Sequence, residues 1–216
     1  MLKKIKKEIM FTKSFDIETL TFSAGVHGNE LSGSIALLSE NIPIEGLKLN
    51  KQIVSMPRIN FDGIQKNSRY DKDGNDMNRL YGMDKKVSEN TKNVIDFVED
   101  VVLKSYCVID FHEAKGYRVR DRTGNGNTII TENNDEFAEF VVNEINKDIP
   151  EDNKFLVYKN KKPIKGTLRE FCTKNKIKYC LIEVSNEQPL LRRVKICKDI
   201  IRACIKYTRS IDGSKD

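Results

Sequence analysis

Two histidines, His27 and His112, are the only imidazoles in this chain of 216 residues, and each follows an apolar run. His27 and Glu30 are three residues apart, at a point where a strand pattern gives way to a helical one. Residues i and i+3 share a helix face, so this imidazole and this carboxylate can face one point. His112 comes at the end of a second predicted strand and could supply a third ligand.

Two histidines and a glutamate suit catalytic zinc, because three protein ligands leave one position open for water. An isolated histidine is more commonly a core or surface residue without a ligand. Here both histidines follow buried-strand patterns and one has a carboxylate at ligand spacing, which favours the metal interpretation.

The segments that must position these residues alternate between strands and helices. Apolar runs predict strands, and helical periodicity predicts helices. Such alternation is typical of an α/β fold with a mostly parallel sheet and helices on both faces, and the length fits a single domain over residues 1–216. Sites in open α/β sheets gather at the carboxyl ends of strands, where His27, His112 and Glu183 fall. The predicted strands are 20–24, 52–56, 106–111, 128–131, 155–158 and 179–184, and the predicted helices are 31–39, 87–103, 137–145, 167–174 and 190–207.

Three further positions could do chemistry. Glu183 lies in the apolar stretch Leu181–Val184, where it is either a general base or the partner of a buried cation. The long irregular segment from Arg58 to Gly82 carries Arg69 and the pair Asn78 and Arg79. A guanidinium binds a carboxylate through two parallel hydrogen bonds, although a single loop arginine is usually a solvated surface residue.

Composition excludes several classes of function. The net charge of +6 is modest, and no basic stripe is interleaved with aromatic residues, so nucleic acid is not an expected partner. No apolar run is long enough to cross a membrane. The charged segment 1–9 precedes no apolar h-region and is not expected to be a signal peptide. Five scattered cysteines indicate reduced thiols in a cytoplasmic protein.

Four motifs in chain order carry a resemblance: GVHGNELSG, RYDKDGNDMNRLYG, VIDFHEA and IKYCLIEVS. Together they resemble the zinc carboxypeptidase superfamily (M14), and most closely its succinylglutamate desuccinylase/aspartoacylase branch. The similarity covers about residues 20–190. It implies an eight-stranded mixed sheet between helices and hydrolysis of an amide bond beside a free carboxylate.

The resemblance also implies a role for each candidate residue. One Zn²⁺ per chain would be held by the two histidines and Glu30. The remaining residues would act on the substrate, which would be a peptide, a cell-wall fragment or an N-acyl amino acid. The implied set is His27, Glu30 and His112 as metal ligands, Glu183 as general base and proton shuttle, Arg69 as polariser of the scissile carbonyl, and Asn78 and Arg79 as the carboxylate clamp.

Three features of the sequence leave the substrate open. Classical carboxypeptidases carry a mobile tyrosine where this chain has Lys161–Pro163, and Tyr158 is close but not aligned. At the specificity position, Leu168 would favour an apolar leaving residue and Arg169 an acidic one. The sequence ends soon after Tyr207, and without a further β-rich domain an open site would suit a peptide or cell-wall fragment better than a small acyl amino acid.

Two alternatives remain. The chain could be a catalytically impaired module that binds a peptide or a polyanion on the same fold. It could also be a metal-free α/β protein whose basic surface binds a polyanion. The sequence does not indicate an oligomeric state.

Overall fold

The structure is a computed structural model that describes residues 10–11, 19–40, 52–84, 86–159 and 162–211. The charged segment 1–9, predicted not to be a signal peptide, lies outside these residues, as does Lys161. None of the described helices is long and apolar enough to cross a membrane.

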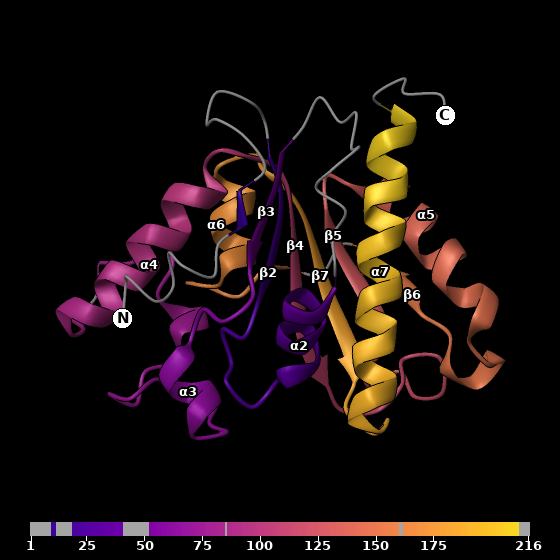
Figure 1. Ribbon diagram of the computed structural model, residues 1–216, viewed down its shortest axis with the longest axis horizontal. Helices are drawn as coiled ribbons and strands as arrows, with labels where there is room; N and C mark the ends of the chain where they lie inside the picture. Colours follow the sequence, from indigo (N-terminus) through magenta and orange to yellow (C-terminus); the bar gives the residue numbers. More distant parts are fainter. Residues whose placement is uncertain (1–9, 12–18, 41–51, 85, 160–161, 212–216) are drawn as a thin grey trace.

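The described strands form one sheet in the order β1-β3-β2-β4-β7-β5-β6 (Figure 1). The four central strands β3, β2, β4 and β7 are mutually parallel. β1 pairs antiparallel with β3, and β5 pairs antiparallel with β7 and parallel with β6. The predicted mixed, mostly parallel sheet is therefore confirmed. The strands are β1 (Met10–Phe11), β2 (Thr19–Ala24), β3 (Gln52–Met56), β4 (Ser105–Ala114), β5 (Thr128–Glu132), β6 (Leu156–Tyr158) and β7 (Lys178–Ser185).

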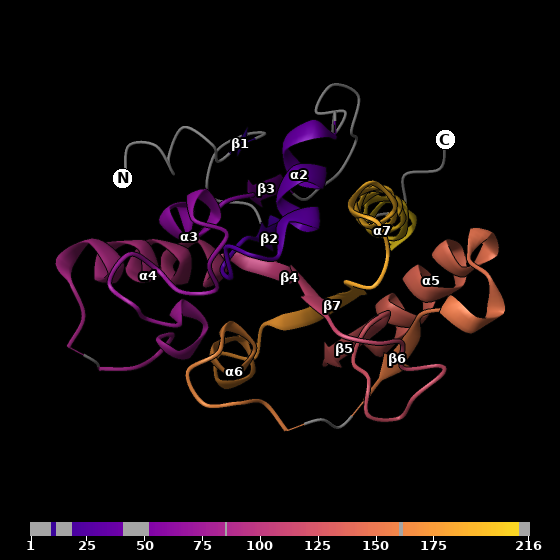
Figure 2. The same cartoon turned by 90° about the horizontal axis from the view of Figure 1, so that it is seen from below.

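Helices cover both faces of the sheet, as Figure 2 shows. α2 (Leu31–Ser39), α5 (Asp135–Ile145) and α7 (Leu190–Ile211) pack on one face. α4 (Glu89–Val102) and α6 (Leu168–Lys174) pack on the other. Each face has its own apolar cluster, so the central strands are buried on both sides and consist largely of apolar residues.

Strand alternation decides which residues of β4 and β7 can meet. Successive side chains of a strand point to opposite faces. Ile109 of β4 joins the cluster under α2 and α7, whereas Val108 joins the cluster under α4 and α6. Asp110 and His112 point to the same face as Val108, and His112 stands directly opposite Glu183 in the β4–β7 register. The two strands therefore deliver these polar side chains to the same edge and face.

The structure differs from the sequence pattern at three places. β4 does not end before His112 but continues to Ala114. It does so because all of β7 pairs with it, up to the pair of Ala114 and Ser185. The segment 58–82, predicted to be irregular, contains α3 (Phe61–Gln65) and a 3₁₀ turn (Met77–Arg79). The described residues form seven strands where the resemblance implies eight, and one of the seven is the two-residue edge strand β1, too short to leave a sequence pattern.

Candidate functional site

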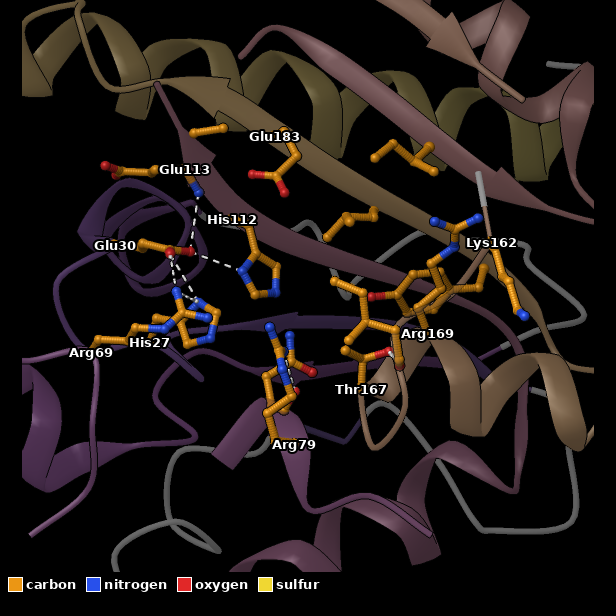
Figure 3. Close-up of a pocket in the computed structure, with 16 residues that line it drawn as sticks. His27, Glu30, Arg69, Arg79, His112, Glu113, Lys162, Thr167, Arg169 and Glu183 are labelled. Atoms are coloured by element: carbon orange, nitrogen blue, oxygen red, sulfur yellow. Dashed lines mark hydrogen bonds and ion pairs between the residues drawn. The ribbon is translucent and has the colours of Figure 1, made fainter. Parts of the chain in front are cut away.

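One cavity at the carboxyl end of the parallel strands is lined by all seven residues predicted to act (Figure 3). They come from the turn after β2, the segment between β3 and α4, and the ends of β4 and β7. Positions as distant in the chain as His27 and Glu183 thus contribute to a single space. The seven are His27, Glu30, Arg69, Asn78, Arg79, His112 and Glu183.

The turn between β2 and α2 places the first two candidate ligands. His27 Nδ1 lies 2.8 Å from Glu30 Oε1, and the Glu30 amide donates to the carbonyl of His27 at 3.2 Å. A Cβ on Gly28 would lie 2.0 Å from the backbone carbon of Gly63, so only glycine permits this close approach to α3. The turn is therefore held against a neighbouring helix, which fixes where His27 points.

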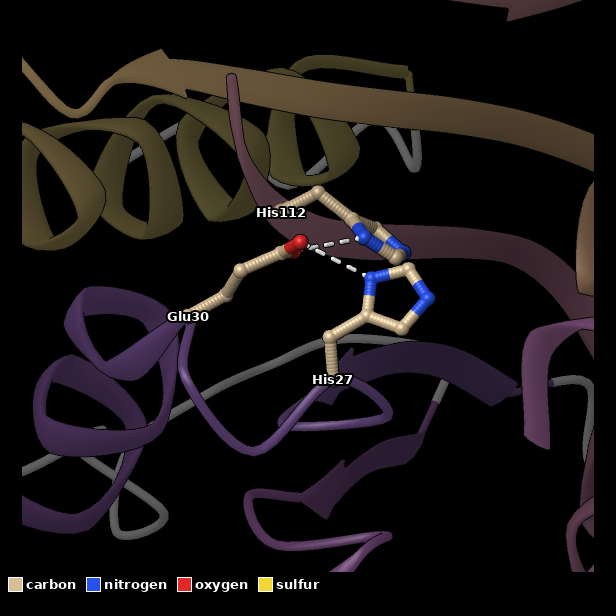
Figure 4. Close-up of side chains that lie close together, drawn as sticks. All are labelled: His27, Glu30 and His112. Atoms are coloured by element: carbon tan, nitrogen blue, oxygen red, sulfur yellow. Dashed lines mark hydrogen bonds and ion pairs between the residues drawn. The ribbon is translucent and has the colours of Figure 1, made fainter. Parts of the chain in front are cut away.

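The third candidate ligand completes a compact group. His112 Nδ1 lies 2.8 Å from Glu30 Oε2, so the Glu30 carboxylate faces both imidazoles (Figure 4). One ligand atom from each of the three residues can be chosen so that all lie within 4.8 Å of one another. Both histidines are buried and Glu30 is nearly so.

The second nitrogen of each imidazole is also held by a carboxylate. His27 Nε2 lies 3.2 Å from Asp76 Oδ1, and His112 Nε2 lies 3.1 Å from Asp110 Oδ2. Metal-binding histidines commonly direct their other ring nitrogen to a carboxylate, which fixes the tautomer and ring orientation. Neither Asp76 nor Asp110 was identified from the sequence as part of the site.

The donor set fits a bound cation. A neutral imidazole carries one N–H, and a carboxylate oxygen only accepts hydrogen bonds. If the Nε2 protons face Asp76 and Asp110, both Nδ1 lone pairs face the carboxylate of Glu30, and Arg69 Nη1, 3.2 Å from His27 Nδ1, brings positive charge to one side of this cluster of electron pairs. A metal ion would bring positive charge between all three residues, and two imidazoles with one carboxylate are ligands that zinc prefers.

The pKa values of Glu30 and His112 are both shifted in the direction that favours the charged form of each group. Burial alone would raise the pKa of Glu30, but His112 and His27 lower it well below its usual range. Burial would likewise lower the pKa of His112, but the charges of Asp110 and Glu30 raise it well above its usual value. Both shifts have the same cause, which is that the buried carboxylates favour a positive charge beside Glu30.

Asp110 is the buried anchor of this arrangement. Besides His112, it accepts hydrogen bonds from Ser23 Oγ at 2.7 Å and from Tyr179 Oη at 2.7 Å. Burial would raise its pKa, but His112 and these hydroxyl groups lower it. The signal in the sequence is a carboxylate two residues before His112 in an apolar strand, which puts both on one face.

Arg69 reaches the site through Asp76. Its Nε and Nη2 donate to Asp76 Oδ2 at 3.1 and 2.9 Å. Nη1 lies 3.2 Å from His27 Nδ1 and 3.6 Å from Glu30 Oε1. Burial would raise the pKa of Asp76, but His27 and Arg69 lower it. The guanidinium is therefore fixed beside the ligand group, where it can stabilise a developing negative oxygen.

Asn78 and Arg79 line the cavity from the 3₁₀ turn that Asp76 caps. Asn78 is buried, and its Oδ1 accepts the amide proton of Leu168 at 2.9 Å, which turns the Nδ2 group away from α6. Arg79 Nη1 donates to the carbonyl of Asn78 at 2.6 Å and lies 4.0 Å from Asp76 Oδ2. This pair offers hydrogen-bond donors and positive charge suited to a carboxylate.

Glu183 lines the cavity from the end of β7 and is partly buried (Figure 3). In the register of the sheet, Glu183 stands opposite His112 of β4 on one side and opposite Thr128 of β5 on the other. Its orientation into the cavity suits a group that receives and delivers a proton.

The structure separates the two residues at the predicted specificity position. Leu168 is buried, packs in the cluster under α6 and does not line the cavity. Arg169 does line it, but its guanidinium is buried and paired with Glu132. A paired guanidinium attracts an acidic side chain less than a free one, so the choice between an apolar and an acidic leaving residue stays a prediction.

The segment before Gly166 contributes Lys162 and Ile164 to the cavity wall. Tyr158 is not among the residues that line the cavity in the described part of the chain, and Arg118 lies over its ring at 4.5 Å from the centroid. Tyr158 therefore does not occupy the place of the mobile tyrosine of classical carboxypeptidases.

Sequence comparison supports the resemblance drawn from the four motifs. Residues 16–118 match the family model for the succinylglutamate desuccinylase/aspartoacylase catalytic domain. This stretch contains all of the candidate residues except Glu183. The comparison with curated proteins found no match. The predicted resemblance to the succinylglutamate desuccinylase/aspartoacylase catalytic domains, which are hydrolases, is confirmed over these residues.

Solved structures share the fold. The tripeptide-bound cell shape determinant Csd4 of Helicobacter pylori is 19% identical over 93% of this chain, with a TM-score of 0.78. Its mDAP-bound form, described as a D,L-carboxypeptidase, is 19% identical over 89% of this chain, with a TM-score of 0.75. A succinylglutamate desuccinylase/aspartoacylase of Rhodobacter sphaeroides is 18% identical over 93%, with a TM-score of 0.65.

This chain spans only part of each of these proteins: 55%, 51% and 57% of their chains, respectively. At such low identity the likeness establishes the fold, which is that of the predicted class.

Proposed function

We propose that this relative of the succinylglutamate desuccinylase/aspartoacylase catalytic domains is a zinc-dependent hydrolase. It cleaves an amide bond next to a free carboxylate, within one catalytic domain. One observation carries the proposal: the Glu30 carboxylate lies 2.8 Å from Nδ1 of both His27 and His112, while carboxylates hold both Nε2 atoms. Five free, buried cysteines support a reducing compartment such as the cytoplasm.

His27, Glu30 and His112 would hold the ion. When bound, zinc supplies a Lewis acid that polarises the scissile carbonyl and lowers the pKa of a water molecule. Glu183 takes the proton from the attacking water and passes it to the leaving amine. Arg69 stabilises the negative charge that develops on the carbonyl oxygen.

Asn78 and Arg79 set the position of the scissile bond. They bind the carboxylate of the leaving residue, so the amide next to it lies over the ligand group. Holding the substrate in this way lowers the entropic cost of reaching the transition state.

A short peptide or cell-wall fragment is the substrate class we favour. The tripeptide-bound and mDAP-bound Csd4 structures share this fold and support that class. An N-acyl amino acid is the second candidate, and it is supported by the family match over residues 16–118.

The test combines metal analysis with turnover. Purified protein should contain about one zinc per chain, lose activity with a chelator and regain it with Zn²⁺. A panel of short peptides and N-acyl amino acids, each with a free carboxylate, should contain at least one substrate. Folded protein that binds no transition metal would refute the zinc site, and metal-loaded protein that turns over none of the panel would favour a binding module.

A further inference from the structure

Helix α2 begins at Leu31, and the side chain of Glu30, the residue before it, does not cap it. The residue at the start of a helix normally accepts a hydrogen bond from the amides of the first turn. Glu30 makes no such side-chain bond, because its carboxylate is turned toward His27 and His112. The first turn of α2 therefore needs an acceptor from elsewhere in the chain.

Glu113 supplies that acceptor from β4. Its Oε1 accepts the amide proton of Ser32, the second residue of α2, at 2.9 Å. Its own amide donates to Glu30 Oε2 at 3.1 Å. In Figure 3 the Glu113 side chain points away from His112. Glu113 thus contacts both the carboxylate of Glu30 and the helix that carries it.

Arg193 of α7 holds the other oxygen of Glu113. Its Nη1 donates to Glu113 Oε2, and both side chains are largely buried. An isolated buried carboxylate would be costly, and the Arg193 guanidinium supplies a partner of opposite charge. Three elements, β4, α2 and α7, therefore meet at one carboxylate directly behind the ligand group.

We infer that Glu113 is a positioning residue for Glu30, and that Arg193 fixes Glu113 in turn. Glu113 replaces the cap that Glu30 gives up in order to face the two histidines. In this role the Glu113 carboxylate acts through Glu30, because its oxygens are held by Ser32 and Arg193. The inference rests on the proposed metal-dependent function, because its effect is on how well Glu30 is presented to a cation.

The chain offers a control in another ion pair between a glutamate and α7. Glu40 lies directly after α2, and its Oε1 accepts from Arg202 Nε of α7 at 2.8 Å. It lies at the opposite end of α2 from Glu30. Removing the charge of Glu40 weakens the contact between α2 and α7 without touching the residues beside the ligands.

The experiment measures the zinc dissociation constant by competition with a chromophoric chelator, and the melting temperature of the metal-free protein. Glu113→Gln keeps an oxygen that can accept from Ser32 but loses the charge pairing with Arg193. Loss of such an outer partner typically costs about 10–100-fold in metal affinity. We expect Glu113→Gln near the lower value and Glu113→Ala near the higher, with Glu40→Gln within about twofold of the wild type.

The Glu113→Ala protein could fail to fold, and Glu113→Gln then decides the matter. A Glu113→Gln protein that binds zinc as tightly as the wild type would overturn the inference. Equal weakening by Glu113→Gln and Glu40→Gln at equal loss of melting temperature would also overturn it, since the effect would then be general destabilisation. If the wild type itself binds no zinc, the proposed function fails, and that outcome is distinct from both.

Discussion

The carboxylate clamp can be tested by removing one partner at a time. Arg79→Ala removes the guanidinium, and amidation of the substrate removes its carboxylate. Because both changes break the same contact, each should lower kcat/KM, and the two together should cost little more than either alone. The substrate for this test is the best one from the panel, compared as free acid and as C-terminal amide.

The structure sets the size of the expected loss. A hydrogen bond to a charged group contributes about 1.5–3 kcal/mol. The Arg79 side chain is 34% exposed and lies 4.0 Å from Asp76 Oδ2, so solvent and a competing carboxylate weaken its hold on the substrate. The lower part of the range, about 1.5–2 kcal/mol, corresponds to about a 10- to 30-fold loss of kcat/KM.

The control is Arg192→Ala, which removes a guanidinium of α7 that donates to the carbonyl of Asp148 and is not among the residues that line the cavity of the candidate site. It should leave kcat/KM within about twofold. Equal turnover of the free acid and its amide by the wild-type protein would refute the clamp. Fully multiplicative losses would show that Arg79 acts on some other part of the substrate.

Three other changes test the rest of the site and its supporting loop. His112→Ala should abolish zinc binding, measured as metal content per chain. Glu183→Gln should keep the metal and lower kcat by about 10²–10⁴-fold. Near wild-type turnover of Glu183→Gln would mean that Glu183 has only a structural role. Asp110→Asn should weaken zinc binding about 10–100-fold in a competition titration, and unchanged affinity would mean that the His112 ring is oriented without Asp110. Burial would raise the pKa of Asp71, but the hydrogen bonds it accepts, first from Asn75, lower it below 3.8. A depressed carboxyl pKa stabilises the fold above pH 3.8 and loses this effect at lower pH. Asp71→Asn should therefore lower the melting temperature at pH 6 and differ less from the wild type below pH 3.8, and a difference independent of pH would contradict this.

Much of the fold followed from local pattern. Six of the seven strands and the five longer helices leave periodic apolar signals, because each buries one or both faces against a neighbour. The edge strand β1 and the short helix α3 leave none, since two and five residues are too few to show a period. The extension of β4 through His112 depended on pairing with β7, which lies about 70 residues further along the chain.

The candidate ligands were also readable from the chain. Only two histidines occur, each after a buried strand, and the spacing of His27 and Glu30 is local. The resemblance carried by the four motifs then implied roles for Arg69, Asn78 and Glu183. All of these side chains line one cavity, as the meeting of parallel strand ends at one sheet edge leads one to expect.

Tertiary structure alone decided which partner each buried charge has. The sequence left Arg169 as a possible attractor of acidic groups, but Glu132 from β5 neutralises it. Nothing in the sequence indicated that Glu113 caps α2, or that Arg193 of the last helix pairs with Glu113. Ion pairs and hydrogen bonds between distant segments depend on packing distances of a few ångströms. Such distances are fixed only when the sheet and both helical layers are assembled, so no local pattern of residue types encodes them.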